Sequence, residues 1–140
     1  PYDELWSPES VSYWSERLYK EMEIKILALS DTIGCATVDT VEQLFKQLID
    51  GLPQVEFGAH MHVKPEHASA IVQAAYENGC RRFDGAVNGF GGCPMAKDDL
   101  TGNMPTERML DWFNENGISS GIDAIEFNKA QSLALSIFPH

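Results

Sequence analysis

Two histidines, His60 and His62, stand one residue apart at the end of a largely apolar run. If this run is a β-strand, both imidazoles point to the same face, because side chains alternate between the two faces of a strand. Imidazole nitrogens bind first-row divalent metals, and oxygen ligands in the remaining positions would favour a six-coordinate ion such as Mg²⁺ or Mn²⁺ over tetrahedral Zn²⁺. A pair of hydrogen-bonded histidines on a sheet face explains an isolated His-x-His motif equally well. The spacing alone therefore leaves a metal site and a structural pair open.

Asp31 and Asn103 are the candidate side chains that carry oxygen. Asp31 directly follows another apolar run, so its carboxylate would lie at the end of a strand, which favours a functional role. Aspartate in this position also caps turns, here through Thr32 and Gly34. Asn103 offers an amide oxygen for an oxygen-rich metal shell. Taken by itself, Asn103 is better explained as an N-cap or turn residue before a helix that starts near Pro105.

A glycine-rich loop at residues 88–94 carries Cys93. Gly89, Gly91 and Gly92 can adopt backbone dihedral angles that are barred to other residues, so the loop can bend tightly or approach a ligand closely. A cysteine at its tip can be exposed, and a nearby cation would favour its thiolate and a role in proton transfer. A lone cysteine is more often structural. The loop also lacks the glycine spacings of P-loop and dinucleotide-binding motifs, which weakens a nucleotide-binding interpretation.

These residues must be positioned by strands and helices, and the hydrophobic pattern predicts both. Three short apolar runs, 24–29, 55–62 and 82–87, suit β-strands, and each follows a segment with helical periodicity. Ser7 before Pro8 predicts an N-cap for the first helix, while the second should begin after Asp39 or Thr40. We expect helices at 8–22, 40–50 and 65–78 before the strands, and at 106–116 and 123–135 after the glycine-rich loop.

The spacing of the expected strands suggests repeated strand-helix units. They begin at 24, 55 and 82 and so recur after 31 and 27 residues, while a TIM barrel of roughly 250 residues has eight units of similar length. An open doubly wound sheet has the same local pattern, so the spacing does not choose between them. Both folds carry their chemistry on the loops after the strands, so Asp31, His60, His62 and the glycine-rich loop would gather at one rim. No linker separates a second domain.

Composition limits the partners and the compartment. With 21 acidic and 10 basic residues the chain carries a formal charge of −11, which repels nucleic acid and anionic membranes. An anionic substrate would need a local cation, and a metal ion would supply it. Three cysteines without a metal-binding or redox spacing argue against disulfides and for a reducing compartment. We therefore expect no nucleic-acid or membrane partner and a cytoplasmic location, with mitochondria or peroxisomes left open.

Four motifs in this order resemble those of 3-hydroxy-3-methylglutaryl-CoA lyases, and the similarity covers nearly the whole chain. They are Ser-Asp-Thr-Ile-Gly at 30–34, Ala-His-Met-His at 59–62, Gly-Phe-Gly-Gly-Cys-Pro-Met-Ala at 89–96 and Thr-Gly-Asn at 101–103. This resemblance implies an α/β fold, the (β/α)8 TIM barrel. Residues 1–140 would form the C-terminal portion of its single catalytic domain, with about three βα units followed by C-terminal helices.

The resemblance also implies roles for individual residues. His60, His62 and Asn103 would be metal ligands for Mg²⁺ or Mn²⁺, Cys93 the catalytic cysteine, and Asp31 the active-site aspartate. The glycines of the loop, Gly89, Gly91 and Gly92, would let it approach the substrate. The family's Arg-Asp metal motif, its catalytic arginine and an upstream glutamate have no counterpart here, so the opening residues, which lack an initiator methionine, read as the middle of a longer protein.

The activity that this implies is cleavage of 3-hydroxy-3-methylglutaryl-CoA to acetyl-CoA and acetoacetate by metal-assisted retro-Claisen chemistry. Asp31 or His60 would help remove the hydroxyl proton, and Cys93 would protonate the enolate. A related acyl-CoA condensing synthase and an inactive half-barrel fragment are the alternatives, and a zinc hydrolase has only the His-x-His motif in its favour. We expect the isolated chain to be incomplete and inactive, and to form a homo-oligomer such as a dimer or to pair with the missing N-terminal half.

Overall fold

The computed structural model describes residues 6–93 and 101–138. Helices and strands alternate through most of this part, as the hydrophobic pattern predicts. The elements in chain order are α1 (Pro8–Met22), β1 (Ile26–Asp31), α2 (Val38–Gly51), β2 (Glu56–Val63), the 3-10 helix η1 (Pro65–His67), α3 (Ala68–Glu77), β3 (Arg82–Asp84), the 3-10 turn η2 (Val87–Gly89), β4 (Gly102–Asn103), α4 (Thr106–Glu115) and α5 (Ala124–Ile137).

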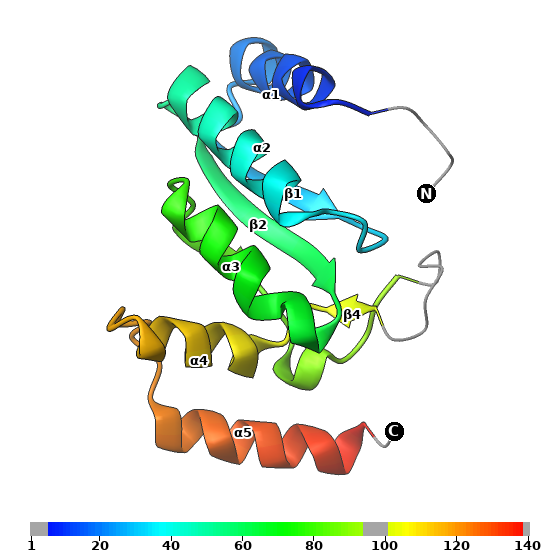
Figure 1. The fold of residues 1–140 in the computed structure, drawn as a ribbon, viewed down its shortest axis with the longest axis vertical. Helices are drawn as coiled ribbons and strands as arrows, with labels where there is room; N and C mark the ends of the chain where they lie inside the picture. The colour runs from blue at the N-terminus through cyan, green and yellow to red at the C-terminus, as the bar shows by residue number, and fades with distance from the viewer. Residues whose placement is uncertain (1–5, 94–100, 139–140) are drawn as a thin grey trace.

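The three predicted strands form a parallel sheet in the order β1-β2-β3. Ser30 of β1 stands opposite His60 of β2, and His60 stands opposite Asp84 of β3. Helices α2, α3 and α4 lie along one side of the sheet (Figure 1). Because the strands are parallel neighbours, their carboxyl ends meet at one edge, as the repeated strand-helix pattern predicted.

The core lies between this sheet and the helices on its covered side. Val41, Phe45 and Leu48 of α2 and Val72 of α3 are almost completely buried. The central strand β2 is buried over nearly its whole length, and its side chains Phe57, Ala59 and Met61 belong to this core. The apolar face predicted for α2 is therefore confirmed, and it holds β2 in place.

The starts of the helices follow local chemistry that the sequence revealed in part. Ser7 caps α1 as predicted, through a reciprocal capping box with Ser10. The second helix starts two residues earlier than expected, because Thr37 is its N-cap and accepts a hydrogen bond from the Thr40 backbone. The third predicted helix is divided, since the backbone N–H of His67 bonds the carbonyl of Lys64 in a 3-10 turn before α3 begins.

Strand β4 was not predicted. Its two residues, Gly102 and Asn103, pair antiparallel with the end of β2, so that Asn103 stands opposite His62 and Gly102 opposite Val63. The N-cap of α4 is Pro105, which has no side-chain capping bond. The interpretation of Asn103 as an N-cap is therefore wrong, because β2 holds the segment before α4 in an extended conformation.

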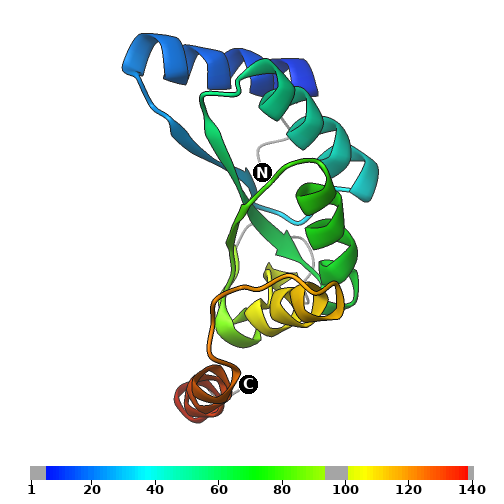
Figure 2. The same ribbon diagram turned by 90° about the vertical axis from the view of Figure 1, so that its left-hand side faces the viewer.

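Helix α5 lies apart from the sheet, and Figure 2 shows it end on below the rest of the fold. Its main tertiary neighbour is η2. Several of its large apolar side chains, including Ile125, Leu133 and Ile137, are exposed. In the described ranges, 6–93 and 101–138, the structure contains no helix with the length and hydrophobicity needed to cross a membrane.

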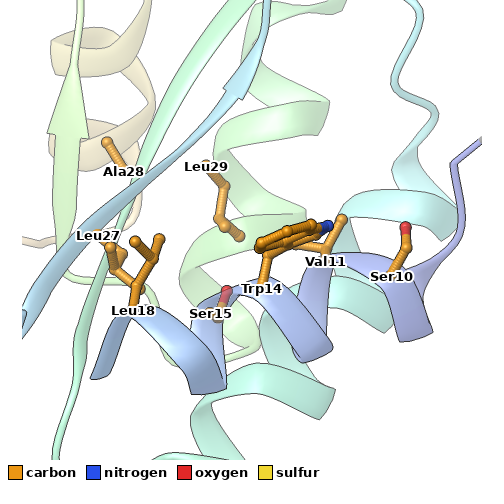
Figure 3. A pocket seen from close by; sticks show the side chains of 8 residues that line it. All are labelled: Ser10, Val11, Trp14, Ser15, Leu18, Leu27, Ala28 and Leu29. Atoms are coloured by element: carbon orange, nitrogen blue, oxygen red, sulfur yellow. The ribbon is translucent and has the colours of Figure 1, made fainter. Parts of the chain in front are cut away.

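A pocket of about 250 Å³ lies between α1 and β1 (Figure 3). Its lining is mostly apolar and includes Val11, Trp14 and Leu18 of α1 with Leu27 and Leu29 of β1. The face predicted for α1 is therefore only partly covered, and Trp14 is 56% exposed. Strand β1 pairs with β2 on one side only within the described residues, so the pocket opens beside a free strand edge.

Candidate functional site

The carboxyl ends of the parallel strands bring four of the predicted site residues to one region. Asp31 ends β1, His60 and His62 lie near the end of β2, and Asn103 stands opposite His62 through β4. The imidazole rings of His60 and His62 have centroids 5.8 Å apart with an angle of 68° between their planes. Metal–imidazole bonds are about 2.1 Å long, so both rings can reach one ion at this edge.

His62 is buried, and a backbone group of the neighbouring strand orients it. Its Nδ1 lies 2.9 Å from the backbone carbonyl oxygen of Asp31. A carbonyl oxygen only accepts hydrogen bonds, so Nδ1 must carry the proton. In a neutral imidazole this leaves the lone pair on Nε2, which is the form that binds a metal.

His60 is oriented in the same way from the opposite side of β2. Its Nδ1 lies 3.3 Å from the Oδ2 atom of Asp84 on β3. The carboxylate accepts, so Nδ1 again carries the proton and Nε2 keeps the lone pair. A carboxylate that supports a histidine in this way is the usual partner of a metal-bound imidazole.

Asn103 is oriented by the glycine-rich loop. Its Nδ2 donates to the backbone carbonyl of Phe90 at 2.8 Å, so the amide oxygen is not used in that bond. Gly91 has a φ of +81°, and a Cβ atom there would lie 3.0 Å from the Asn103 amide nitrogen. The loop can therefore pass this close to Asn103 only because glycine stands at that position.

Asp31 has a structural task that differs in detail from the one predicted. Its Oδ1 accepts from the backbone N–H of Cys35 at 3.1 Å, and its Oδ2 accepts from that of Ala36 at 2.7 Å. The expected partners, Thr32 and Gly34, are not the ones used, because the turn places the next two N–H groups towards the carboxylate. Partial burial, and then the nearby Asp31 charge, raise the pKa of the Cys35 thiol, which therefore is not an activated thiolate.

Cys93 ends the first described part of the chain and is half-buried. The loop that leads to it passes through left-handed backbone at Asn88, with a φ of +55°. The last three residues of the glycine-rich motif, 94–96, lie outside the described residues. The structure thus supports the tight bending predicted for Gly89 and Gly91, while the chemistry of the thiol stays a prediction.

Two carboxylates near this edge were not singled out from the sequence. Asp84 supports His60, and the Nε atom of Arg82 lies 4.0 Å from its Oδ1. Asp84 could have been found from the two-residue alternation that places Arg82 and Asp84 on the same face of β3. The predicted strand extended to residue 87, so Asp84 was not recognised as the residue that ends it. Glu107 accepts from the backbone N–H of Asn88 at 2.9 Å, a contact across 19 residues with no sequence signature.

The donor atoms at this edge decide whether the divalent cation that the motifs imply can bind here. Among the described residues, no group of three or more His, Cys, Asp or Glu side chains is placed to hold a metal. A site at this edge therefore needs the amide oxygen of Asn103 beside His60 and His62, with further ligands from outside these residues. Two imidazole nitrogens with an amide oxygen suit a first-row divalent ion, so the residues present fit such a cation.

Comparisons with known proteins agree in family and in fold. Residues 8–134 match the family model described as HMGL-like. The hydroxymethylglutaryl-CoA lyase of Pseudomonas mevalonii is 37% identical over 123 residues, which cover 88% of this chain and 40% of that protein. The (R)-citramalyl-CoA lyase of Chloroflexus aurantiacus is 34% identical, with 88% of this chain and 38% of that protein covered.

A solved structure extends the agreement to three dimensions. The HMG-CoA lyase of Acinetobacter baumannii, solved with coenzyme A and 3-methylmalate, superposes with a TM-score of 0.85 at 30% identity and covers 100% of this chain and 45% of that one. The α/β architecture is therefore that of part of a TIM barrel, as predicted. The chain spans less than half the length of each of these three proteins.

Proposed function

Since this chain belongs to the HMGL-like family, as its motifs predicted, we propose that it carries the metal-binding side of the active site of a carbon–carbon lyase. The reaction is the cleavage of 3-hydroxy-3-methylglutaryl-CoA to acetyl-CoA and acetoacetate. The observation that carries this proposal is the orientation of the two histidines. Both Nδ1 atoms face hydrogen-bond acceptors, the Asp84 carboxylate and the Asp31 carbonyl, so both Nε2 atoms keep lone pairs, and Asn103 stands opposite His62.

His60, His62 and Asn103 would hold the cation, with Mg²⁺ or Mn²⁺ as the ions favoured by a mixed nitrogen and oxygen donor set. When bound, a divalent cation would acidify the substrate hydroxyl and orient the bond to be broken. The residues of the chain prepare this site. Asp84 holds His60, and the Asp31 carbonyl holds His62, so neither imidazole must reorient when the ion arrives.

Removal of the hydroxyl proton falls to Asp31 rather than to His60. With Nδ1 protonated towards Asp84, Nε2 is the nitrogen of His60 that would hold the cation, and the ring would then have no lone pair left for a proton. Oδ1 of Asp31 accepts both the backbone N–H and the thiol of Cys35, whereas Oδ2 accepts only the backbone N–H of Ala36 among the described residues and retains a second lone pair. A carboxylate held in this way is a fixed acceptor at the end of β1.

Cys93 supplies the second proton transfer. Once the hydroxyl oxygen has lost its proton, the carbon–carbon bond breaks and its electron pair passes to the thioester part as an enolate. The Cys93 thiol then gives its proton to the enolate carbon, which forms acetyl-CoA. The glycines before it allow the loop to bring the thiol to the substrate.

A condensing synthase has no specific observation in its favour, because the curated relatives named above are lyases. The identity of the acyl group in the substrate is a separate question. One relative is named for hydroxymethylglutaryl-CoA and another for (R)-citramalyl-CoA, and both substrates carry a tertiary hydroxyl beside the bond that breaks. We take hydroxymethylglutaryl-CoA as the substrate because the Pseudomonas mevalonii enzyme has the higher identity, at 37% against 34%.

The 140 residues are proposed to be the C-terminal portion of a single barrel domain and to be inactive by themselves. The support is the free edge of β1 and the open apolar pocket beside it, both of which further strand-helix units would cover. The rest of the barrel would also bring the remaining metal ligand. The rest of the barrel is supplied by the same polypeptide or by a partner, and a homodimer is the assembly we expect. The three cysteines are free thiols, which supports a reducing compartment, the cytoplasm first.

The test is product formation by the natural full-length protein and by the 140-residue chain. Each is incubated with hydroxymethylglutaryl-CoA or (R)-citramalyl-CoA, with Mn²⁺, Mg²⁺ or a chelator. We expect the full-length protein to release acetyl-CoA and acetoacetate from hydroxymethylglutaryl-CoA only with a divalent cation, and the chain alone to release neither. Turnover in the chelator, or preferred turnover of citramalyl-CoA, would contradict the metal or the acyl group, respectively.

A further inference from the structure

We propose that Gln131 of α5 is a positioning residue, which holds Asn88 at the base of the glycine-rich loop and thereby sets the place of Cys93. Asn88 and Gln131 are 43 residues apart in sequence, yet the Nε2 atom of Gln131 donates to Oδ1 of Asn88 at 2.8 Å. The catalytic consequence rests on the proposed function of Cys93, whereas the positioning itself does not.

Asn88 is a suitable point of control because the backbone turns there. Its φ of +55° lies in the left-handed region, which costs a non-glycine residue free energy unless its neighbours hold it. Two helices do so. The Glu107 carboxylate of α4 accepts its backbone N–H at 2.9 Å, and Gln131 of α5 bonds its side chain.

The amide nitrogen of Asn88 is buried, and among the described residues it has no hydrogen-bond partner. Leaving such a donor unpaired is costly, so burial alone does not explain why asparagine stands here. If both amides are flipped, the nitrogen of Asn88 donates to Gln131 instead, and the link between the two side chains is kept. The contact with α5 is therefore the feature that orients this side chain.

Helix α5 is packed as a support for the loop rather than as a cover for the sheet. Its main tertiary neighbour is η2, and the rings of Phe138 at its end and Phe90 in the loop have centroids 5.4 Å apart. Figure 1 shows α5 running below α4, away from the strands. The contact of Gln131 with Asn88 and that of Phe138 with Phe90 both fall on residues 88–90, which precede Cys93.

The same short segment is tied to the proposed metal ligand. The carbonyl of Phe90 accepts from the amide of Asn103, so the loop base is held between α5 on one side and β4 on the other. Gly91 and Gly92 follow, and glycines have no side chains with which to fix the loop themselves. The place of Cys93 therefore depends on the anchors at residues 88–90.

The experiment replaces Gln131 in the natural full-length protein. Gln131→Met keeps the length of the side chain but removes its hydrogen bonds, and Asn128→Met on the same helix is the matched control, since Asn128 is exposed. Alkylation of individual cysteines by iodoacetamide is followed by peptide mass spectrometry. We expect the rate at Cys93 to change about fivefold, the factor that one neutral hydrogen bond supports, while the exposed Cys35 serves as an internal reference and does not change.

Activity gives the second measurement. In Gln131→Met we expect kcat to fall about fivefold, with KM and Mn²⁺ affinity unchanged, because only the place of the thiol is altered. Gln131→Glu should recover most of the activity, since its carboxylate can accept from the Asn88 amide nitrogen. A merely structural role would lower the melting temperature without this separation of kcat from KM or this recovery.

The two proposals fail in different ways. Unchanged alkylation of Cys93 in Gln131→Met overturns the positioning role, as does an equal change in Asn128→Met. If Cys93→Ala keeps full turnover while Gln131→Met still alters the alkylation of Cys93, the positioning stands and the proposed catalytic role of Cys93 is lost.

Discussion

The Nδ1 atom of His62 donates to the backbone carbonyl oxygen of Asp31 across the β1–β2 pair at 2.9 Å. The bond joins the two motifs Ser-Asp-Thr-Ile-Gly and Ala-His-Met-His through a backbone atom. On the other side of β2, His60 has the corresponding partner in Asp84 of β3. Each histidine of the central strand is therefore held by a different neighbouring strand, and both imidazoles keep the same nitrogen for a metal.

Removing the carboxylate that supports His60 should weaken metal binding. In Asp84→Ala the imidazole loses the acceptor at its Nδ1, and loss of such a partner costs about 10–100-fold in metal affinity. Asp84→Asn, whose amide oxygen can still accept, should lie between this variant and the wild type. Mn²⁺ titration by calorimetry measures the affinity. Asp50→Ala is the control, because Asp50 is exposed and forms an ion pair with Lys46, and an equal loss in both alanine variants would argue against the role of Asp84.

Replacing Cys93 separates catalysis from metal binding. Cys93→Ala in the natural full-length protein should lower kcat by about 100-fold or more, the usual worth of a positioned proton donor, and leave the Mn²⁺ affinity within about twofold, because the thiol is no ligand in this account. Cys80→Ala is the comparison, since the Cys80 thiol is buried in the core away from the proposed site. Equal activity in the two variants would remove Cys93 from the mechanism.

Gly34 lies where the turn after β1 meets the end of β2. A Cβ atom there would overlap the methyl group of Thr101 and lie 3.1 Å from the His62 carbonyl oxygen, at a φ of +67°. Gly117 has nearly the same φ, +68°, with nothing within 4 Å. Gly117→Ala should cost about 1 kcal/mol of unfolding free energy for the backbone alone, and Gly34→Ala about 1–3 kcal/mol more from the overlap. Urea unfolding measures both, and equal costs would show that this turn tolerates a side chain.

Stability at alkaline pH should depend on the buried thiol of Cys80. Burial raises the pKa of Cys80 to about 11, whereas an unfolded cysteine ionises near 8.5. Between these values the unfolded chain binds fewer protons than the folded chain. The stabilisation that the protonated Cys80 thiol contributes is therefore complete below about pH 8.5 and is lost as pH rises towards 11. The free energy of unfolding should fall by up to about 1.4 kcal/mol per pH unit in this interval. Cys80→Ala should show a smaller fall in unfolding free energy over this interval, and an identical fall would refute the assignment.

Much of the fold follows from local patterns. The parallel order of the three strands, the apolar face of α2 and the Ser7 cap of α1 each depend on periodicity or on a cap within a few residues, which a sequence displays directly. Strand β4 did not follow, because two residues are too few to show a period and their conformation is imposed by β2. The early end of β3 was missed for a related reason, since apolar residues continue after Asp84 while the sheet does not.

The sequence indicated which residues belong to the site but not which partners hold their side chains. The rule that parallel strands end at one edge placed His60, His62 and Asp31 near one another, and only the family resemblance added Asn103. Their partners come from elsewhere in the chain: Asp84 from β3, the Phe90 carbonyl from the loop, and the backbone N–H groups of the turn after Asp31. Such contacts depend on the packing of several elements, and a single sequence without its fold does not specify them.

The central claim is that the two histidines of β2 and the amide of β4 bind one divalent ion, and paramagnetic NMR tests it directly. Mn²⁺ is titrated into the 15N-labelled natural full-length protein while the imidazole signals and the Asn103 side-chain amide are followed. We predict that His60, His62 and Asn103 broaden together at the lowest Mn²⁺ concentrations and more strongly than exposed His67, and that His60→Ala removes the additional broadening at Asn103. Broadening of His67 to the same degree, or a sharp Asn103 amide while His60 broadens, would contradict the account.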